Sequence, residues 1–148
     1  MCTQRQSTVV FVPIGVDVKR DLDLIRALML RLEENEKLNA SSWMIPCAKG
    51  KHDQVAIDAL DFPNFSLDVL NYHFALLFNA GFVMGKTFGL GETLKISGLA
   101  WDGHEFLANI KNNDIWEKTK SRISDLPGIA LKVVAAIAQA EMMKKLGL

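Results

Sequence analysis

The side chains best suited to bind a metal ion or to move protons in this chain are its histidines, His52, His73 and His104. His104 has two acidic neighbours, Asp102 and Glu105, and an imidazole beside two carboxylates can bind a divalent metal. The same acids also stabilise the positive end of a helix without any metal. His73 adjoins an apolar stripe, where a hydrogen-bonded core histidine is the commoner outcome. We therefore expect no metal site and no cofactor.

The chain lacks the sequence motifs of the common catalytic sites. It has no Gly-x-Ser-x-Gly, no P-loop and no His-Glu-x-x-His, and its two cysteines, Cys2 and Cys47, are not placed beside a histidine. The glycine-rich stretch 89–98 (GLGETLKISG) has neither the Gly-Lys-Ser/Thr ending of a P-loop nor the Gly-x-Gly-x-x-Gly spacing of a dinucleotide-binding loop. Its glycines more simply permit turn geometry. These absences predict a protein that is not an enzyme.

A helix expected over residues 66–79 and the glycine-rich turn that follows it offer a candidate binding surface. The helix positions off its apolar stripe and two lysines beside the turn are candidate contacts with a partner or with DNA: Asp68, Asn71, Tyr72, Ala75, Asn79, Lys86 and Lys95. No Lys or Arg occurs between Lys51 and Lys86. A DNA-reading helix usually supplies Arg or Lys to guanine or phosphate, so packing or a protein contact is favoured for this helix. The two lysines either contact phosphates or are simply solvated.

The elements that must position these residues follow an order that is typical of a winged-helix domain. Ser66 caps the helix and Gly81 stops it. A brief strand at 82–84, a hairpin and a returning strand come next. A tight turn at 102–103 then starts another helix, over 101–110. This order predicts a recognition-type helix followed by a wing.

Before this unit, apolar residues at steps of three and four predict a helix over 17–34, with Asp17 as its N-cap. Residues 35–52 lose this periodicity and are expected to form a loop. Apolar and polar residues alternate over 54–60, which predicts a short half-buried strand.

After this unit, Asp114 and Glu117 have the spacing of a capping box that opens a helix to about Ser124. The last expected helix, over 129–146, is apolar on most of its surface. Because such a helix must be buried, it either packs across the open side of its own domain or forms a homodimer.

The overall composition limits the classes of function. The chain has 148 residues, enough for one domain, and its 17 basic and 17 acidic residues give a net charge of zero. Because there is no positive excess, the chain has no general attraction to nucleic acid. The apolar N-terminal run is too short for a signal peptide, and the cysteines suit a reduced compartment. We expect a cytoplasmic protein without a membrane-spanning segment.

Several stretches resemble a widespread family of small proteins, chiefly of bacteria and their phages, that is classified as a domain of unknown function. They are VKRDLDLIRALMLRLEEN, LNYHFALLFNAGFVMG, LAWDGHEFLANIKNNDIWEKTKSRI and KKLGL. The chain is also similar to YjcQ-like winged-helix proteins, whose motif LTxxGxxFL corresponds to residues 99–107, with Ala100 in place of Thr. The resemblance covers about 18–148. It implies a winged-helix-like fold and a phage or prophage origin, and it assigns no catalytic residue.

We therefore predict an α+β fold with a winged-helix-like domain at 18–110 and a C-terminal helical extension at 111–148. Residues 1–17 form an N-terminal extension, which is either an added edge strand or the result of a start codon assigned too early. The predicted function is that of a non-catalytic protein-interaction module, encoded by a phage or prophage and acting on a host or phage protein. The alternative is a dimeric winged-helix DNA-binding transcriptional regulator.

Overall fold

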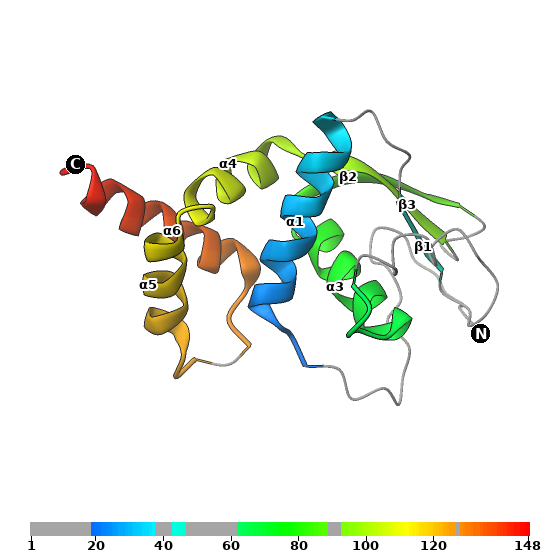
Figure 1. The fold of residues 1–148 in the computed structure, drawn as a ribbon, viewed down its shortest axis with the longest axis horizontal. Coiled ribbons are helices and arrows are strands. Elements are labelled where there is room, and N and C mark those ends of the chain that lie inside the picture. Colours follow the sequence, from blue (N-terminus) through cyan, green and yellow to red (C-terminus); the bar gives the residue numbers. More distant parts are fainter. Residues whose placement is uncertain (1–18, 38–42, 47–61, 89–92, 127) are drawn as a thin grey trace.

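The computed structural model describes residues 19–37, 43–46, 62–88, 93–126 and 128–148. Helices and a small antiparallel sheet alternate in these ranges, so the predicted α+β class is confirmed. The elements are α1 (Leu22–Lys37), β1 (Trp43–Pro46), α3 (Leu67–Asn79), β2 (Val83–Phe88), β3 (Thr93–Leu99), α4 (Trp101–Ile110), α5 (Asn113–Ile123) and α6 (Leu131–Lys145). The sheet lies at one end, α4, α5 and α6 gather at the other, and α1 runs between them (Figure 1).

The sheet has the strand order β1-β3-β2, and both pairs are antiparallel. Strand β1 pairs with β3 from Trp43 opposite Ile96 to Pro46 opposite Thr93. The expectation of a loop throughout 35–52 is therefore wrong at two places. Residues 35–37 continue helix α1, and β1 is a strand of four residues, which is too short to show an alternating pattern. The predicted strand at 54–60 and the extension at 1–17 lie outside the described residues.

Helix α1 begins at Leu22, so the prediction that Asp17 is its N-cap is wrong. Asp21 takes that role. Its side chain accepts a hydrogen bond from the backbone N–H of Leu24 at 3.1 Å, and its carbonyl accepts one from Ile25 at 3.1 Å. The apolar positions at steps of three and four are buried as predicted: Leu24, Ile25, Leu28, Met29 and Leu32.

The predicted unit of helix, strand, strand and helix is confirmed. The Ser66 hydroxyl accepts a hydrogen bond from Val69 N at the start of α3, and Gly81 adopts a φ of 82° just after the end of that helix. Gly103 has a different role from the predicted turn, since it lies inside the first turn of α4. A β-carbon at Gly103 would lie 2.0 Å from the carbonyl oxygen of Phe82. The glycine therefore lets α4 approach the chain just before β2.

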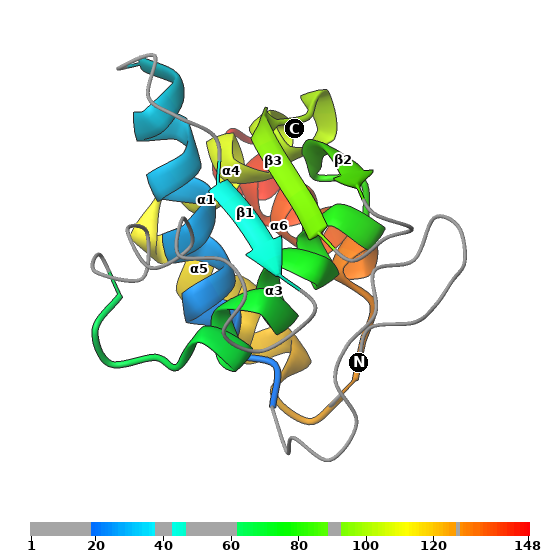
Figure 2. The same cartoon turned by 90° about the vertical axis from the view of Figure 1, so that its right-hand side faces the viewer.

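Helix α5 is capped by Asn112, whose side chain accepts a hydrogen bond from Ile115 N at 3.1 Å. The predicted capping box of Asp114 and Glu117 is wrong, because the helix starts two residues earlier than that box requires. Asp114 instead forms ion pairs with Lys118 at 3.2 Å and with Lys145 of α6 at 3.4 Å. Helix α6 turns one side toward the core, at Leu131, Val134, Ala138 and Glu141. When the sheet faces the viewer, helices lie behind it (Figure 2).

Candidate functional site

Helix α3 is a core helix rather than an exposed reading helix. Among its residues of described exposure, only Asn79 is exposed, while Asp68 and Tyr72 are half-buried. Asn71 and Ala75 are 8% and 2% exposed, so the expectation that they face outward is wrong. The reason is that α3 contacts α1 as well as strands β1 and β2, and therefore more than one of its sides is covered.

His73 ties α3 to the beginning of α1. The ring is fully buried, with its Nε2 atom 2.8 Å from the Asp21 backbone nitrogen and its Nδ1 atom 2.7 Å from the Val69 carbonyl oxygen. Because a backbone N–H can only donate, Nε2 accepts from Asp21 and Nδ1–H donates to Val69. The ring is therefore neutral. Burial lowers the pKa of His73, and the prediction of a hydrogen-bonded core histidine is confirmed.

Acid is expected to destabilise the fold through His73. Protonation at Nε2 would turn the acceptor of the Asp21 N–H into a second N–H, and the two donors would then face each other. The charged groups that act on the ring are Asp21 and Arg20. Because the pKa is lower in the folded chain, the unfolded chain takes up the proton first. The contribution of His73 to stability is therefore complete above pH 6.5, the ordinary pKa of histidine, and is lost as the pH falls below it.

Urea unfolding at about pH 7.5 and about pH 5.5 measures this loss, because the interval spans the ordinary histidine titration. The non-titrating variant His73→Asn should have a lower free energy of unfolding than the parent at the higher pH. That free energy should also change less between the two pH values than it does in the parent. His104→Asn is the matched control at a partly exposed histidine. Equal pH dependence of the parent and His73→Asn would show that His73 carries none of the effect.

Lys86 and Lys95 lie directly opposite each other on β2 and β3. Both side chains are exposed, and neither forms an ion pair in the described part of the chain. Met84 lies two residues before Lys86 on the same side of the strand and is 51% exposed. We call Met84, Lys86 and Lys95 the sheet face. Like charges directly opposite each other in a sheet repel and destabilise it. An anionic group bound at the sheet face would therefore reduce the repulsion between the two lysines.

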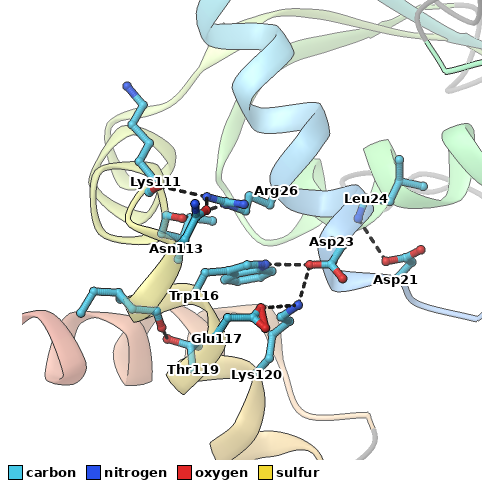
Figure 3. Close-up of polar contacts among 12 residues, drawn as sticks. Asp21, Asp23, Leu24, Arg26, Lys111, Asn113, Trp116, Glu117, Thr119 and Lys120 are labelled. Atoms are coloured by element: carbon cyan, nitrogen blue, oxygen red, sulfur yellow. Dashed lines mark hydrogen bonds and ion pairs between the residues drawn. The ribbon is translucent and has the colours of Figure 1, made fainter.

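A polar cluster joins α1 to α5 (Figure 3). The indole N–H of Trp116 donates to Asp23 Oδ1 at 2.7 Å, and Lys120 Nζ donates to the same oxygen at 2.9 Å. Lys120 thereby lowers the pKa of Asp23, which in turn raises the pKa of Lys120. The amino group of Lys120 also lies 5.6 Å from the centre of the Trp116 ring.

Arg26 extends this cluster to the junction between α4 and α5. Its guanidinium donates to the carbonyl oxygens of Ile110 at 2.8 Å and Lys111 at 3.0 Å, and to Asn113 Oδ1 at 2.7 Å. The carbonyls at the end of α4 are thereby satisfied by a side chain of α1. Sequence reasoning missed the cluster, because its partners lie 84 to 97 positions apart and follow no spacing pattern. Its contacts hold helices together, and we assign it a structural role.

The described residues form no candidate metal centre. Within the described ranges, no three His, Cys, Asp or Glu side chains come together in a way that could hold a metal ion. His104 is partly buried and already has an interaction partner, and His52 lies outside the described residues. None of the described helices is both long enough and apolar enough to cross a membrane.

Comparison with known proteins places the chain in a family. Residues 19–130 match the family described as "Hypothetical protein (DUF2513)". An uncharacterized protein of Haemophilus influenzae is 31% identical over 132 residues, which are 85% of this chain and 99% of that relative. No solved structure matches the chain. The matched segment runs from the residues just before α1 to those just before α6, and so includes the whole sheet, α3 and the α1–α5 cluster. The chain therefore belongs to the DUF2513 family.

Proposed function

We propose that this chain is a non-catalytic protein-interaction module of winged-helix type, related to the YjcQ-like proteins and encoded by a phage or prophage. The observation that carries the proposal is the burial of α3. A helix that reads DNA must present several side chains to base edges in the major groove. In α3 only Asn79, at the end of the helix, is exposed among the residues of described exposure. The helix in the recognition position is thus used for packing.

The sheet face is the surface that we assign to the partner. Met84 offers an apolar side chain, and Lys86 and Lys95 place two positive charges beside it. An acidic surface on a host or phage protein complements this arrangement and removes the repulsion between the lysines. The zero net charge of the chain supports a local contact of this kind over general binding to polyanions.

A photo-crosslinking amino acid at Met84, introduced in the native cell, tests the proposal. We expect a covalent adduct with one other protein. The double variant Lys86→Glu, Lys95→Glu should weaken adduct formation about tenfold or more, because each reversal turns an attraction into a repulsion. The same crosslinker at Asn79 is the matched control on the exposed end of α3. An adduct that forms equally from Asn79, or that survives both charge reversals, would contradict the assignment.

The alternative is a dimeric DNA-binding regulator, and one observation favours it. Lys86 and Lys95 lie on β2 and β3, where the wing of a winged helix would contact phosphates. Fluorescence anisotropy with mixed DNA duplexes at low salt separates the two functions, since low salt strengthens phosphate contacts most. We expect no binding. Binding that is lost in the Lys86→Glu, Lys95→Glu variant would overturn the protein-interaction proposal in favour of DNA.

A further inference from the structure

A pocket of about 1080 Å³ opens between the start of α1, the middle of α3 and the end of α5. The start of α1 and the end of α5 lie at the same end of the molecule (Figure 1). All of the lining residues belong to 19–130, the segment that matches the DUF2513 family. The pocket is therefore built by the part of the chain that places it in this family, and none of the sheet-face residues lines it.

Two contacts hold the walls of this pocket in place before any ligand arrives. His73 of α3 accepts the backbone N–H of Asp21, which lines the pocket just before α1, at 2.8 Å. Lys120 of α5 donates to the carboxylate of Asp23 at 2.9 Å, and both residues line the pocket (Figure 3). Small-molecule sites in proteins are usually preformed in this way, because the ordering of the walls on binding would reduce the affinity.

One part of the lining is apolar and comes from every segment that surrounds the pocket. Leu22 lies on α1, Leu76 on α3, Ile123 at the end of α5 and Leu126 in the segment that follows. Leu126 is 55% exposed in the free protein. A ligand with an apolar body would cover these side chains and remove their exposed area from water.

Another part of the lining offers hydrogen-bond donors that are still available to a ligand. Lys19 is exposed and forms no ion pair within the described part of the chain. The guanidinium of Arg20 donates to the carbonyl oxygen of Ile129, and no described carboxylate pairs with it. The hydroxyl of Tyr72 has no hydrogen bond among the described residues. These groups can donate to an anion without first giving up another partner.

The charged side chains of the lining have an excess of one positive charge. Three of them are cationic, namely Lys19, Arg20 and Lys120, and two are anionic, namely Asp21 and Asp23. Both acids already accept hydrogen bonds, Asp21 from the first turn of α1 and Asp23 within the α1–α5 cluster. A ligand with a single negative charge balances this lining. A phosphate monoester, which carries up to about two charges at neutral pH, would leave one of them facing the acids.

We propose that this pocket binds a small amphipathic carboxylate, a molecule with one negative charge on an apolar body. Lys19 and Arg20 donate to the carboxylate, and the Tyr72 hydroxyl supplies a third donor. The apolar body packs against Leu76 and Leu126. The site requires no second protein, so it does not rest on the interaction proposed for the sheet face.

Titration of the isotope-labelled chain with octanoate, followed by amide chemical shifts, tests the proposal. Saturable shifts should gather at the start of α1, at 72–76 and at 123–126, and should be absent from β2 and β3. Octanol carries the same chain without the charge, and inorganic phosphate carries charge without the chain. Octanol should bind at least about tenfold more weakly than octanoate, and phosphate should cause no saturable shift up to about 10 mM.

Three variants relate binding to the donors of the lining. Lys19→Gln and Tyr72→Phe should each raise the dissociation constant of octanoate roughly threefold to tenfold, because each removes one donor to the carboxylate. Arg20→Gln should raise it about tenfold or more, while the new amide can still donate to Ile129. Lys132→Gln removes an exposed lysine that does not line this pocket, so it should leave the dissociation constant unchanged.

The amide spectrum of each variant shows whether it is folded, and Lys19→Gln changes only an exposed side chain. Octanoate that causes no saturable shift up to about 10 mM would overturn the proposal. Octanol that binds as tightly as octanoate, or shifts centred outside the lining, would overturn it as well. So would octanoate affinities of Lys19→Gln and Arg20→Gln that equal that of the parent. None of these results bears on the crosslink from Met84, so the two proposals fail separately.

Discussion

Replacing Trp116 with alanine is expected to lower the free energy of unfolding by about 3–5 kcal/mol. The indole is 2% exposed, and its removal would leave a cavity between α5 and α1. The change also removes the N–H that donates to Asp23, although Lys120 still donates to that carboxylate. Most of the expected loss is therefore packing, and a smaller part is the hydrogen bond.

Denaturant unfolding of two variants separates these parts. Trp116→Phe keeps most of the buried ring and loses the donor, so the hydrogen bond alone should account for about 1 kcal/mol. Asp23→Asn in the same background should reduce that difference, because the acceptor charge is already gone. Trp101→Ala is the matched control at an exposed tryptophan. If Trp101→Ala and Trp116→Ala lower the free energy of unfolding by the same amount, the packing account is wrong.

Adding a single methyl group at Gly103 is expected to destabilise the fold by about 1–3 kcal/mol. Alanine is the better helix former by about 1 kcal/mol, so propensity alone predicts the opposite sign. The β-carbon, however, would lie 2.0 Å from the Phe82 carbonyl oxygen and 3.0 Å from its carbon. Both are backbone atoms, so the contact cannot be relieved by a change of side-chain rotamer. Helix α4 would have to move away from the start of β2.

Thermal or urea unfolding of Gly103→Ala gives the sign of the effect directly. Ala108→Gly, at an exposed position of the same helix, supplies the propensity difference without a collision. The control Ala108→Gly should lower the free energy of unfolding by about 1 kcal/mol. Gly103→Ala should also lower it, although alanine has the higher helix propensity. A stabilised Gly103→Ala protein would show that α4 and Phe82 do not pack as closely as described.

The sequence predicts those parts of this fold that depend on near neighbours. Ser66 caps α3 and Gly81 ends it because a cap and a left-handed residue act within a few positions of the helix end. The buried stripe of α1 follows from its own periodicity. The predicted starts of α1 and α5 are less accurate. The true N-caps, Asp21 and Asn112, lie close to other acidic or amide side chains that by sequence could cap the helix equally well.

Contacts between distant segments could not be predicted in this way. Nothing near Asn71 or Ala75 indicates that α1 and two strands will cover a helix on more than one side. The four residues of β1 become a strand only because β3 pairs with them. Asp23 finds Trp116 at a separation of 93 positions, which no local pattern encodes. The candidate surface at the sheet face likewise depends on which residues are left exposed after packing.

The position of Arg26 has a consequence for synthesis on the ribosome. This side chain belongs to the first described helix, yet its partners Ile110, Lys111 and Asn113 are made more than eighty residues later. Until the junction between α4 and α5 has been made, the apolar stripe of α1 lacks part of its cover and the Arg26 guanidinium lacks its acceptors. The nascent chain therefore carries an incomplete structure for most of its translation, and the closing of α1 onto α5 is a late step. A fragment that stops at Ile110 lacks the contacts that complete the core.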